Sequence, residues 1–275
     1  MKKINYVNLS AQWNSEKKFL LPVINSVLNS GSYVNSSEIE KFEKKIAKLC
    51  NTKYCVALNS GTDALVCGLK SLGIKKGDEV ITPPNSFIAS TAAIVHIGAK
   101  PVFVDVLQDQ NIDPIKIEKA ITSKTKAIMP VHLTGRMAKM DAINKISKKY
   151  KIKVIEDAAQ SIGSFYKKKI SGSWGDIGCF STHPLKNLNA MGDGGFITTD
   201  NKKIYLNIKL MRNHGIENRN KVKKFGYVSR MDSLQAAILL HRLTKLDFYI
   251  KKRRDNAKIY FKNINNIQIV LPTEN

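Results

Sequence analysis

Short runs rich in β-branched residues alternate with segments of helical periodicity through most of this 275-residue chain, and that alternation limits the folds open to it. The expected strands are Tyr54 to Leu58, Glu79 to Thr82, Pro101 to Val106, Ala127 to Val131, Lys153 to Glu156, Ile177 to Ser181 and Gly195 to Thr199. The expected helices between the early strands are Thr62 to Leu72, Ile88 to Ile97, Ile115 to Ile121 and Met140 to Tyr150. Strands separated by helices pair in parallel. We therefore predict an α/β fold with a mainly parallel sheet covered by helices on both faces.

The pattern changes in the last third of the chain. The later strands follow one another through long loops, and an amphipathic stretch then runs from about Asp232 to about Asn263. Residues Ile267 to Leu271 are expected to form one more strand, after which the sequence ends. A strand with nothing after it is an unusual place for a domain to stop, so we expect the chain to be cut off there.

The composition indicates a packed protein without a membrane segment. Hydrophobic residues make up 43% of the chain, and no apolar run approaches the roughly 18 residues of a membrane span. The N-terminus lacks the apolar core of a signal peptide, so we expect a cytoplasmic protein. The cysteines show no metal-ligand spacing, and we expect no metal site. Buried thiols in a reducing compartment are expected instead at Cys50, Cys55, Cys67 and Cys179.

The net charge of +23 has two interpretations. Either the protein binds nucleic acid or another polyanion, or lysine is abundant throughout for compositional reasons. The lysines are dispersed, with no basic stripe interleaved with aromatic residues, which favours the second interpretation. The clusters Lys167 to Lys169 and Lys251 to Arg254 leave the first one open. Nucleic acid is therefore not the expected partner.

The segment Asn59-Ser60-Gly61-Thr62 follows an expected strand and opens an expected helix. Gly61 permits a tight turn, and the first N–H groups of a helix have no intrahelical acceptor. Together with the Ser60 and Thr62 hydroxyls, these groups suit a phosphate. Serine and threonine also cap helices for structural reasons alone. The residues by themselves leave both interpretations open.

Asp157 comes directly after the strand that ends at Glu156, where doubly wound sheets place their ligands. A carboxylate there can pair with a pyridinium nitrogen and keep it protonated, which strengthens the ring as an electron sink. The alternative is a loop acid that caps the next segment. Gln160 has the same ambiguity.

The strongest site signal lies between Phe180 and Gly195. One lysine, Lys186, occupies a loop between two expected strands, and glycines at positions 192, 194 and 195 close that loop. A lysine that forms a Schiff base must reach a cofactor and have its pKa lowered by its surroundings. Ser181, at the start of the segment, can donate to the same phosphate as Ser60.

The run from Ser181 to Leu188, with Gly192 to Gly195, resembles the cofactor-lysine segment of the DegT/DnrJ/EryC1/StrS sugar aminotransferases. Further segments agree in the same order and span nearly the whole chain: Asn59 to Leu65, Thr82 to Phe87, Pro130 to Gly135, Glu156 to Gln160 and Arg230 to Ala237. The resemblance implies a three-layer, fold-type I pyridoxal 5′-phosphate enzyme that acts as a homodimer. Residues 1–240 would be the large cofactor-binding domain, and residues 241–275 the start of a truncated C-terminal small domain.

The resemblance also implies residue roles. Lys186 would hold the cofactor as a Schiff base and later move protons between the substrate carbon and the cofactor. Asp157 would pair with the pyridine nitrogen, and Gln160 would lie near the phenolic oxygen. Phe87 would stack on the ring, the alternative being a core aromatic residue. The phosphate would be held by Ser60, Gly61, Thr62 and Ser181.

Other polar residues of the matching segments have less defined roles. We expect His183 to lie at the cofactor and His132 to be a structural histidine. Arg230 is expected to bind substrate. The family usually carries an asparagine shortly before this arginine, contributed to the neighbouring subunit's site, and this chain has Val228 there. Valine cannot form that hydrogen bond to the phosphate.

The implied reaction transfers an amino group, from glutamate, to a keto group of a nucleotide-linked sugar in amino-sugar or polysaccharide biosynthesis. Sugar dehydratases of the same superfamily carry histidine in place of the lysine, so Lys186 favours amino transfer over dehydration. The alternatives are a silent or regulatory relative that binds cofactor or sugar nucleotide without catalysis, a pyridoxal-phosphate-dependent dehydratase or lyase, and a polyanion-binding protein.

Overall fold

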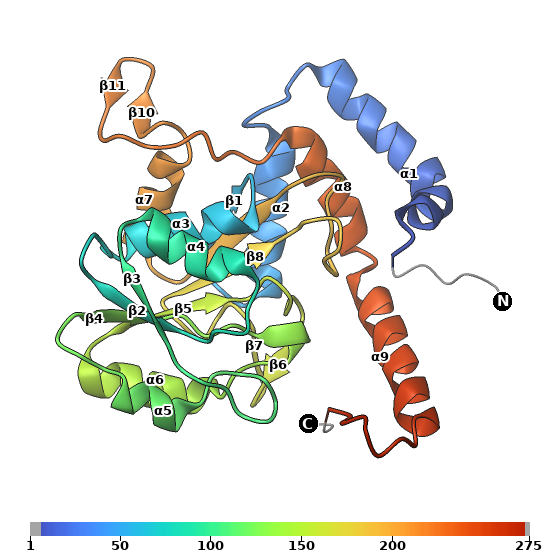
Figure 1. Ribbon diagram of the computed structural model, residues 1–275. Helices are drawn as coiled ribbons and strands as arrows, with labels where there is room; N and C mark the ends of the chain where they lie inside the picture. Colours follow the sequence, from blue (N-terminus) through green and yellow to red (C-terminus); the bar gives the residue numbers. More distant parts are fainter. Residues whose placement is uncertain (1–6, 273–275) are drawn as a thin grey trace.

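A seven-stranded sheet lies at the centre of the computed structural model, which describes residues 7–272 (Figure 1). Across the sheet the strands are β1 (Tyr54–Leu58), β9 (Gly195–Thr199), β8 (Ile177–Ser181), β5 (Lys153–Asp157), β4 (Thr125–Ile128), β2 (Glu79–Thr82) and β3 (Lys100–Phe103). Strand β9 runs antiparallel to both of its neighbours, and all other neighbouring pairs are parallel. The predicted mainly parallel sheet is confirmed.

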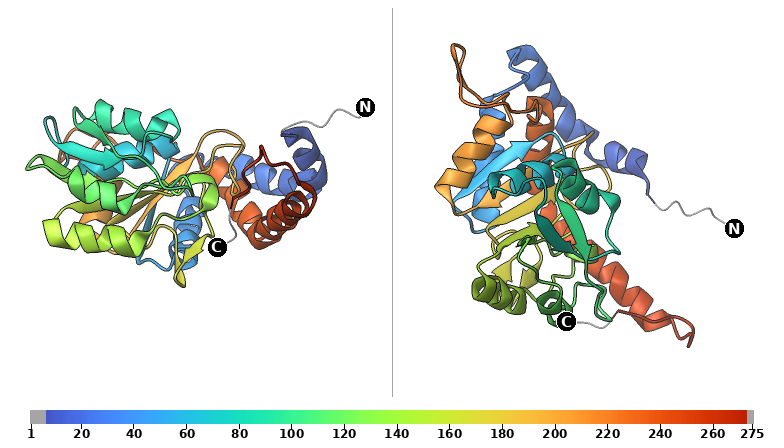
Figure 2. Two further views of the ribbon diagram at one scale, coloured as in Figure 1. Left: turned by 60° about the horizontal axis from the view of Figure 1, so that its bottom comes forward. Right: turned by 60° about the vertical axis from the view of Figure 1, so that its left-hand side comes forward.

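Helices cover both faces of this sheet, as the further views show (Figure 2). One face carries α3 (Gly61–Ser71), α4 (Ile88–His96) and α7 (Lys202–Met211). The other carries α2 (Ser37–Leu49), α5 (Pro114–Lys119), α6 (Met140–Tyr150) and α8 (Ser233–Leu243). The fold is therefore the three-layer arrangement expected from the sequence.

Strand β1 is apolar on both sides because helices cover both of its faces. In β1, Val56 and Leu58 pack with α3 and α7, while Cys55 and Ala57 point into the cluster formed with α2 and α8. Successive side chains of a strand point to opposite faces, so a strand covered on both faces is apolar at most of its positions. This requirement explains why a strand such as β1 was visible in the sequence.

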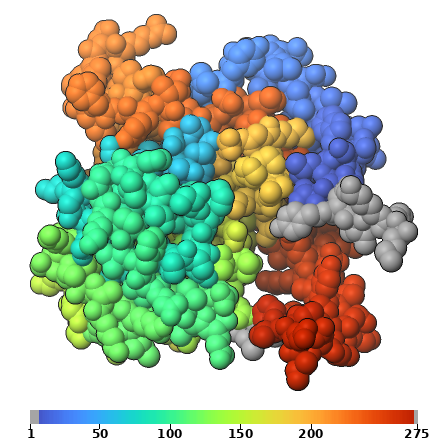
Figure 3. All heavy atoms as spheres, in the orientation of Figure 1, coloured from blue at the N-terminus to red at the C-terminus, as the bar shows by residue number. Residues whose placement is uncertain are grey.

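The amphipathic stretch from Asp232 to Asn263 forms two helices instead of one. α8 ends at Leu243, and α9 (Leu246–Asn263) follows after a break at Thr244 and Lys245. Among the residues of α9, only Leu246 is buried. The space-filling view shows α9 in red and α1 (Leu9–Ser30) in blue on the same flank of the molecule (Figure 3).

The predicted strand from Ile267 to Leu271 is wrong. No strand forms there within the described residues, and the side chains of Ile267 and Val270 are almost fully exposed. A strand needs a neighbour to receive its backbone hydrogen bonds, and this segment extends beyond α9 without one. Leu240, at the predicted domain boundary, lies inside α8, and the division at residue 240 stays a prediction.

Several elements were not expected from the sequence. They are helices α1, α2 and α7, and the two-stranded pairs β6 (Phe165–Tyr166) with β7 (Lys169–Ile170) and β10 (Ile216–Asn218) with β11 (Lys221–Val222). The expectation of buried, unpaired thiols is confirmed for all four cysteines. Within the part of the chain that the structure describes, no helix is long and apolar enough to cross a membrane.

Candidate active site

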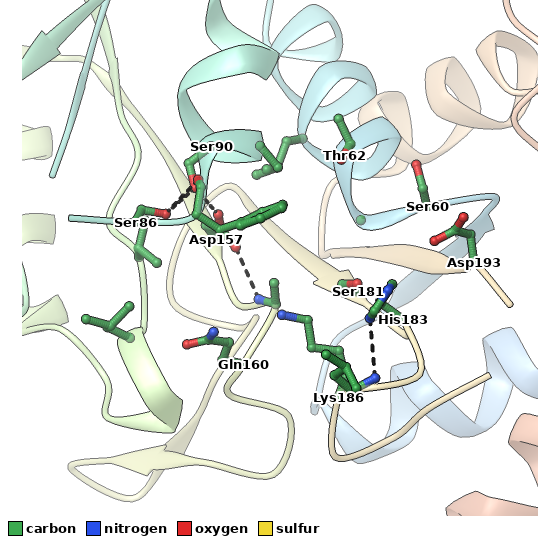
Figure 4. A pocket seen from close by; sticks show the side chains of 18 residues that line it. Ser60, Thr62, Ser86, Ser90, Asp157, Gln160, Ser181, His183, Lys186 and Asp193 are labelled. Carbon is green, nitrogen blue, oxygen red and sulfur yellow. Dashed lines mark hydrogen bonds between the residues drawn. The ribbon is translucent and has the colours of Figure 1, made fainter. Parts of the chain in front are cut away.

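A cavity of about 450 Å³ opens at the carboxyl ends of the parallel strands. Ligands of doubly wound sheets bind at this edge because the loops after neighbouring strands converge there. The cavity brings together nine of the ten predicted site residues: Ser60, Gly61, Thr62, Phe87, Asp157, Gln160, Ser181, His183 and Lys186. They come from segments up to 126 residues apart, and Figure 4 shows how they surround one space.

The N-terminus of α3 forms one end of the cavity. The Ser60 side chain caps this helix, because its hydroxyl oxygen accepts a hydrogen bond from the Asp63 N–H at 3.1 Å. Its own hydroxyl proton remains able to donate to a ligand. A Cβ on Gly61 would lie only 2.6 Å from the Cβ of Ser181, so glycine is required for β8 to end beside the helix. The structural and ligand-binding interpretations of this segment are therefore compatible.

Asp157 lies at the end of β5 and is 5% exposed. One carboxylate oxygen accepts a hydrogen bond from the Ser90 hydroxyl at 2.6 Å, and the other accepts one from the Ala159 N–H at 3.2 Å. Burial raises the pKa of this carboxyl above its ordinary value, and the two hydrogen bonds oppose that rise. The carboxylate also lines the cavity, so it can still meet a cationic ligand group.

Lys186 belongs to the loop between β8 and β9, and buried contacts hold this loop. The Asn189 side chain donates to the Pro184 carbonyl oxygen at 2.9 Å and exchanges hydrogen bonds with Gln12 of α1. Arg242 of α8 donates to the Asn189 carbonyl oxygen at 2.7 Å and pairs with the carboxylate of Glu16. Two helices distant in sequence thus fix the position of the lysine backbone.

The amine of Lys186 is half-buried and extends towards Asp157 (Figure 4). Burial lowers the pKa of this amine, and the negative charge of Asp157 raises it in part. A lower pKa increases the neutral, nucleophilic fraction of a lysine near neutral pH. The local environment therefore favours a lysine that reacts with a carbonyl group.

Gln160 has a defined amide orientation. Its side-chain oxygen accepts a hydrogen bond from the Thr134 N–H at 2.6 Å. Thr134 adopts a left-handed backbone conformation with φ of 55°, which lies within the short turn Leu133–Gly135. Because the oxygen is occupied, the NH₂ group is the part of the amide that can donate to an acceptor in the cavity.

Burial distinguishes the residues that can reach a ligand, Phe87 and His183, from the one that cannot, His132. Phe87 is 73% exposed beside the cavity, so it is not a core residue. His183 is exposed at the cavity, and its Nδ1 accepts a hydrogen bond from the Leu185 N–H. His132 is fully buried: its Nε2 contacts the Glu156 carboxylate at 3.0 Å, and its Nδ1 accepts from the Ala138 N–H. His132 therefore lies outside the cavity with both ring nitrogens occupied, and its structural role stays a prediction.

Arg230 is the predicted site residue that does not line the cavity of this single chain. Its guanidinium group donates to the Asn213 side-chain oxygen at 3.1 Å. Val228 forms an isolated β-bridge with the same residue and is 56% exposed. The substrate-binding role of Arg230 stays a prediction.

Three polar cavity residues were given no role from the sequence: Ser86, Ser90 and Asp193. Ser86 lies just before α4 and Ser90 in its first turn, and their hydroxyls lie 2.5 Å apart. Among residues 7–272, no cluster of three histidine, cysteine or acidic side chains could hold a metal ion.

Comparison with known proteins identifies the family. Residues 14–275 match the DegT/DnrJ/EryC1/StrS aminotransferase family. The chain belongs to this family. It is 46% identical over 258 residues to the dTDP-3-amino-3,6-dideoxy-alpha-D-galactopyranose transaminase of Aneurinibacillus thermoaerophilus, an alignment covering 94% of this chain and 71% of the relative.

Solved structures of family members have the same fold. S. venezuelae DesV, in complex with a ketimine intermediate, superposes with a TM-score of 0.94 at 36% identity, covering 97% of this chain and 72% of DesV. NtdA from Bacillus subtilis, with bound cofactor PMP, superposes with a TM-score of 0.91 at 38% identity, covering 98% and 62%. The chain described here is therefore a fold-type I aminotransferase that uses pyridoxal 5′-phosphate.

The residues around the cavity fit the chemistry of that cofactor. Pyridoxal 5′-phosphate presents a phosphate, a ring nitrogen, a phenolic oxygen and an aldehyde. The cavity offers the N-terminus of α3, where Gly61 has no side chain, and a buried carboxylate at Asp157. It also offers an amide donor at Gln160 and an amine at Lys186. Each ligand group thus has a partner of complementary chemistry within one space.

Burial and the charge of Asp157 act in opposite directions on the pKa of Lys186, and their effects can be measured by titration. In the cofactor-free protein, the labelling rate of Lys186 by an amine-reactive reagent should rise with a midpoint below the ordinary lysine pKa. Asp157→Asn should move the midpoint lower still, because it removes the charge that favours the protonated amine. The midpoints would be measured by mass spectrometry of labelled peptides across a pH series.

Lys116 serves as an internal control in the same experiment. Its amine contacts the Asp105 carboxylate at 2.6 Å, and this hydrogen bond raises the pKa of Lys116. Its labelling midpoint should lie above the ordinary value and be unaffected by Asp157→Asn. A Lys186 midpoint at or above the ordinary value would contradict the described environment.

Proposed function

We propose that this enzyme transfers the amino group of glutamate to a keto group of a nucleotide-linked sugar, for amino-sugar or polysaccharide biosynthesis. The observation that carries the proposal is the placement of Lys186 and Asp157 at one cavity. Relatives named for dTDP- and UDP-linked sugars support the substrate class. Retention of lysine at position 186, where related dehydratases carry histidine, supports amino transfer.

The proposed binding roles follow from the groups described above. The N–H groups that open α3, with the hydroxyls of Ser60, Thr62 and Ser181, would hold the cofactor phosphate. The Gln160 NH₂ group would donate to the phenolic oxygen. Phe87 would cover one face of the ring, because a flat apolar surface beside the cavity suits stacking on an aromatic ring. His183 would contact the cofactor from the lysine loop.

The proposed catalytic roles belong to Lys186 and Asp157. The bound cofactor supplies an aromatic electron sink for a negative charge at the donor's α-carbon. The Asp157 carboxylate would hold a proton on the ring nitrogen through charge pairing. The Lys186 amine would condense with the aldehyde carbon with loss of water and, once freed by the amino donor, would remove the proton from the donor's α-carbon. Its lowered pKa suits both tasks.

The proposal includes a homodimer in the cytoplasm. Exposed apolar side chains around β10 and β11 support a partner subunit that covers this region: Val222, Phe225 and Val228. Arg230 lies beside this region and would bind substrate once a second subunit completes the site. Unpaired thiols at all four cysteines suit a reducing compartment. Residues 1–240 would form the cofactor domain and residues 241–275 the beginning of the small domain.

The covalent role of Lys186 predicts a trapped adduct. Protein incubated with pyridoxal 5′-phosphate should absorb visible light, and borohydride should fix the cofactor on Lys186 as a stable secondary amine. Lys186→Ala should form no adduct at this position, which peptide mass spectrometry would show. Lys224→Ala is the matched control, because burial also lowers the pKa of Lys224, although this residue does not line the cavity. An unchanged adduct level in Lys186→Ala would reject the assignment.

The substrate class predicts a second result. Protein loaded with cofactor should convert glutamate to 2-oxoglutarate when a dTDP- or UDP-linked keto-sugar is supplied, with an amino sugar as the second product. The assay would follow 2-oxoglutarate formation across a panel of keto-sugar nucleotides, with Lys186→Ala as the inactive control. Cofactor binding without amination of any panel member would favour the silent or regulatory alternative.

A further inference from the structure

Two serines connect α4 to the carboxylate at the end of β5. Ser90 is 1% exposed, and its hydroxyl lies 2.6 Å from one Asp157 carboxylate oxygen. The Ser86 hydroxyl lies 2.5 Å from the Ser90 hydroxyl and also lines the cavity. The dashed lines in Figure 4 follow this path from Ser86 through Ser90 to Asp157.

The direction of these hydrogen bonds is set by the carboxylate. An ionised carboxylate only accepts hydrogen bonds, so the Ser90 hydroxyl must donate its single proton to Asp157. Ser86 must then donate to the Ser90 oxygen. A separation of 2.6 Å lies within the range of hydrogen bonds to an ionised oxygen. The serine pair therefore stabilises the charged form of Asp157.

The backbone fixes Ser90 in this position. Ser90 lies in the first turn of α4, and its N–H donates to the Phe87 carbonyl oxygen at 3.2 Å. The helix starts just after β2, and Asp157 ends β5, so the contact joins the first turn of a helix to the end of a strand at the carboxyl edge of the sheet. A carboxylate held through one oxygen by a helix and through the other by the Ala159 N–H keeps one orientation towards the cavity.

We infer that Ser90 is a positioning residue for the cofactor: it keeps Asp157 charged and oriented so that this carboxylate recognises the cofactor's ring nitrogen. This inference rests on the proposed role of Asp157. On this inference, Ser90 contributes to cofactor binding only through the contact between Asp157 and the ring nitrogen. Loss of the hydroxyl should therefore weaken binding of a ligand that has the ring nitrogen and leave binding of a ligand without it unchanged.

The test uses pyridoxamine 5′-phosphate, the amino form of the cofactor, because it has no aldehyde and its affinity reports noncovalent contacts. Its 1-deaza analogue, with CH in place of the ring nitrogen, is the second probe. Ser90→Ala should weaken binding of pyridoxamine 5′-phosphate about tenfold, the size expected for a hydrogen bond to a charged group. Binding of the deaza analogue should change less than about twofold. Isothermal titration calorimetry would measure both.

Ser173→Ala is the matched control. Ser173 is also buried, but its hydroxyl donates to the Ile170 carbonyl oxygen at 2.6 Å and does not line the cavity. This variant should leave both affinities unchanged. Alanine is a strong helix former, so Ser90→Ala should keep α4 intact, and thermal unfolding would verify this. In an Asp157→Asn background, Ser90→Ala should have no further effect on pyridoxamine 5′-phosphate binding.

The outcomes distinguish failure of the Ser90 role from failure of cofactor binding. Equal losses for both probes, or no loss for pyridoxamine 5′-phosphate in Ser90→Ala, would overturn the role of Ser90 while leaving cofactor binding intact. The same weakening by Ser90→Ala in the Asp157→Asn background would also overturn it, because the effect would not pass through Asp157. Failure of the unmodified protein to bind pyridoxamine 5′-phosphate would overturn the proposed function itself.

Discussion

The site depends on a buried carboxylate and a half-buried amine that share one cavity. Asp157 ends β5, and Lys186 lies in the loop that follows the adjacent parallel strand β8, so the sheet brings their two segments to the same edge. Burial disfavours the charged form of each group, and their opposite charges partly offset this effect. The result is an acid that can pair with a cationic ring and an amine that is a better nucleophile than a solvated lysine.

The rest of the fold supports this pair. Helix α4 holds Asp157 through Ser90, and α1 and α8 hold the lysine loop through Asn189 and Arg242. Removing one partner of a buried ion pair costs about 3–5 kcal/mol, because the remaining charge stays unpaired. Arg242 and Glu16 form such a buried pair beside the loop. Rigid elements on both sides of the sheet thus determine where the reactive groups lie.

Local patterns in the sequence predicted the parts of the fold that depend on local burial. Strands apolar on both faces, such as β1, were expected, and Gly61 and Lys186 were expected in loops after strands. The Ser90–Asp157 contact joins residues 67 positions apart and becomes visible only once the sheet places β2 and β5 near each other. The segment from 267 to 271 was mispredicted because β propensity carries no information about a missing neighbour.

The proposed function depends on pairing between Asp157 and a protonated ring nitrogen of the bound cofactor. The most direct measurement is the ¹⁵N NMR spectrum of protein loaded with pyridoxal 5′-phosphate labelled at that nitrogen. We expect a protonated nitrogen with a one-bond N–H coupling at pH values well above those at which the free cofactor loses this proton. A resonance typical of a neutral pyridine nitrogen under these conditions would contradict the pairing with Asp157.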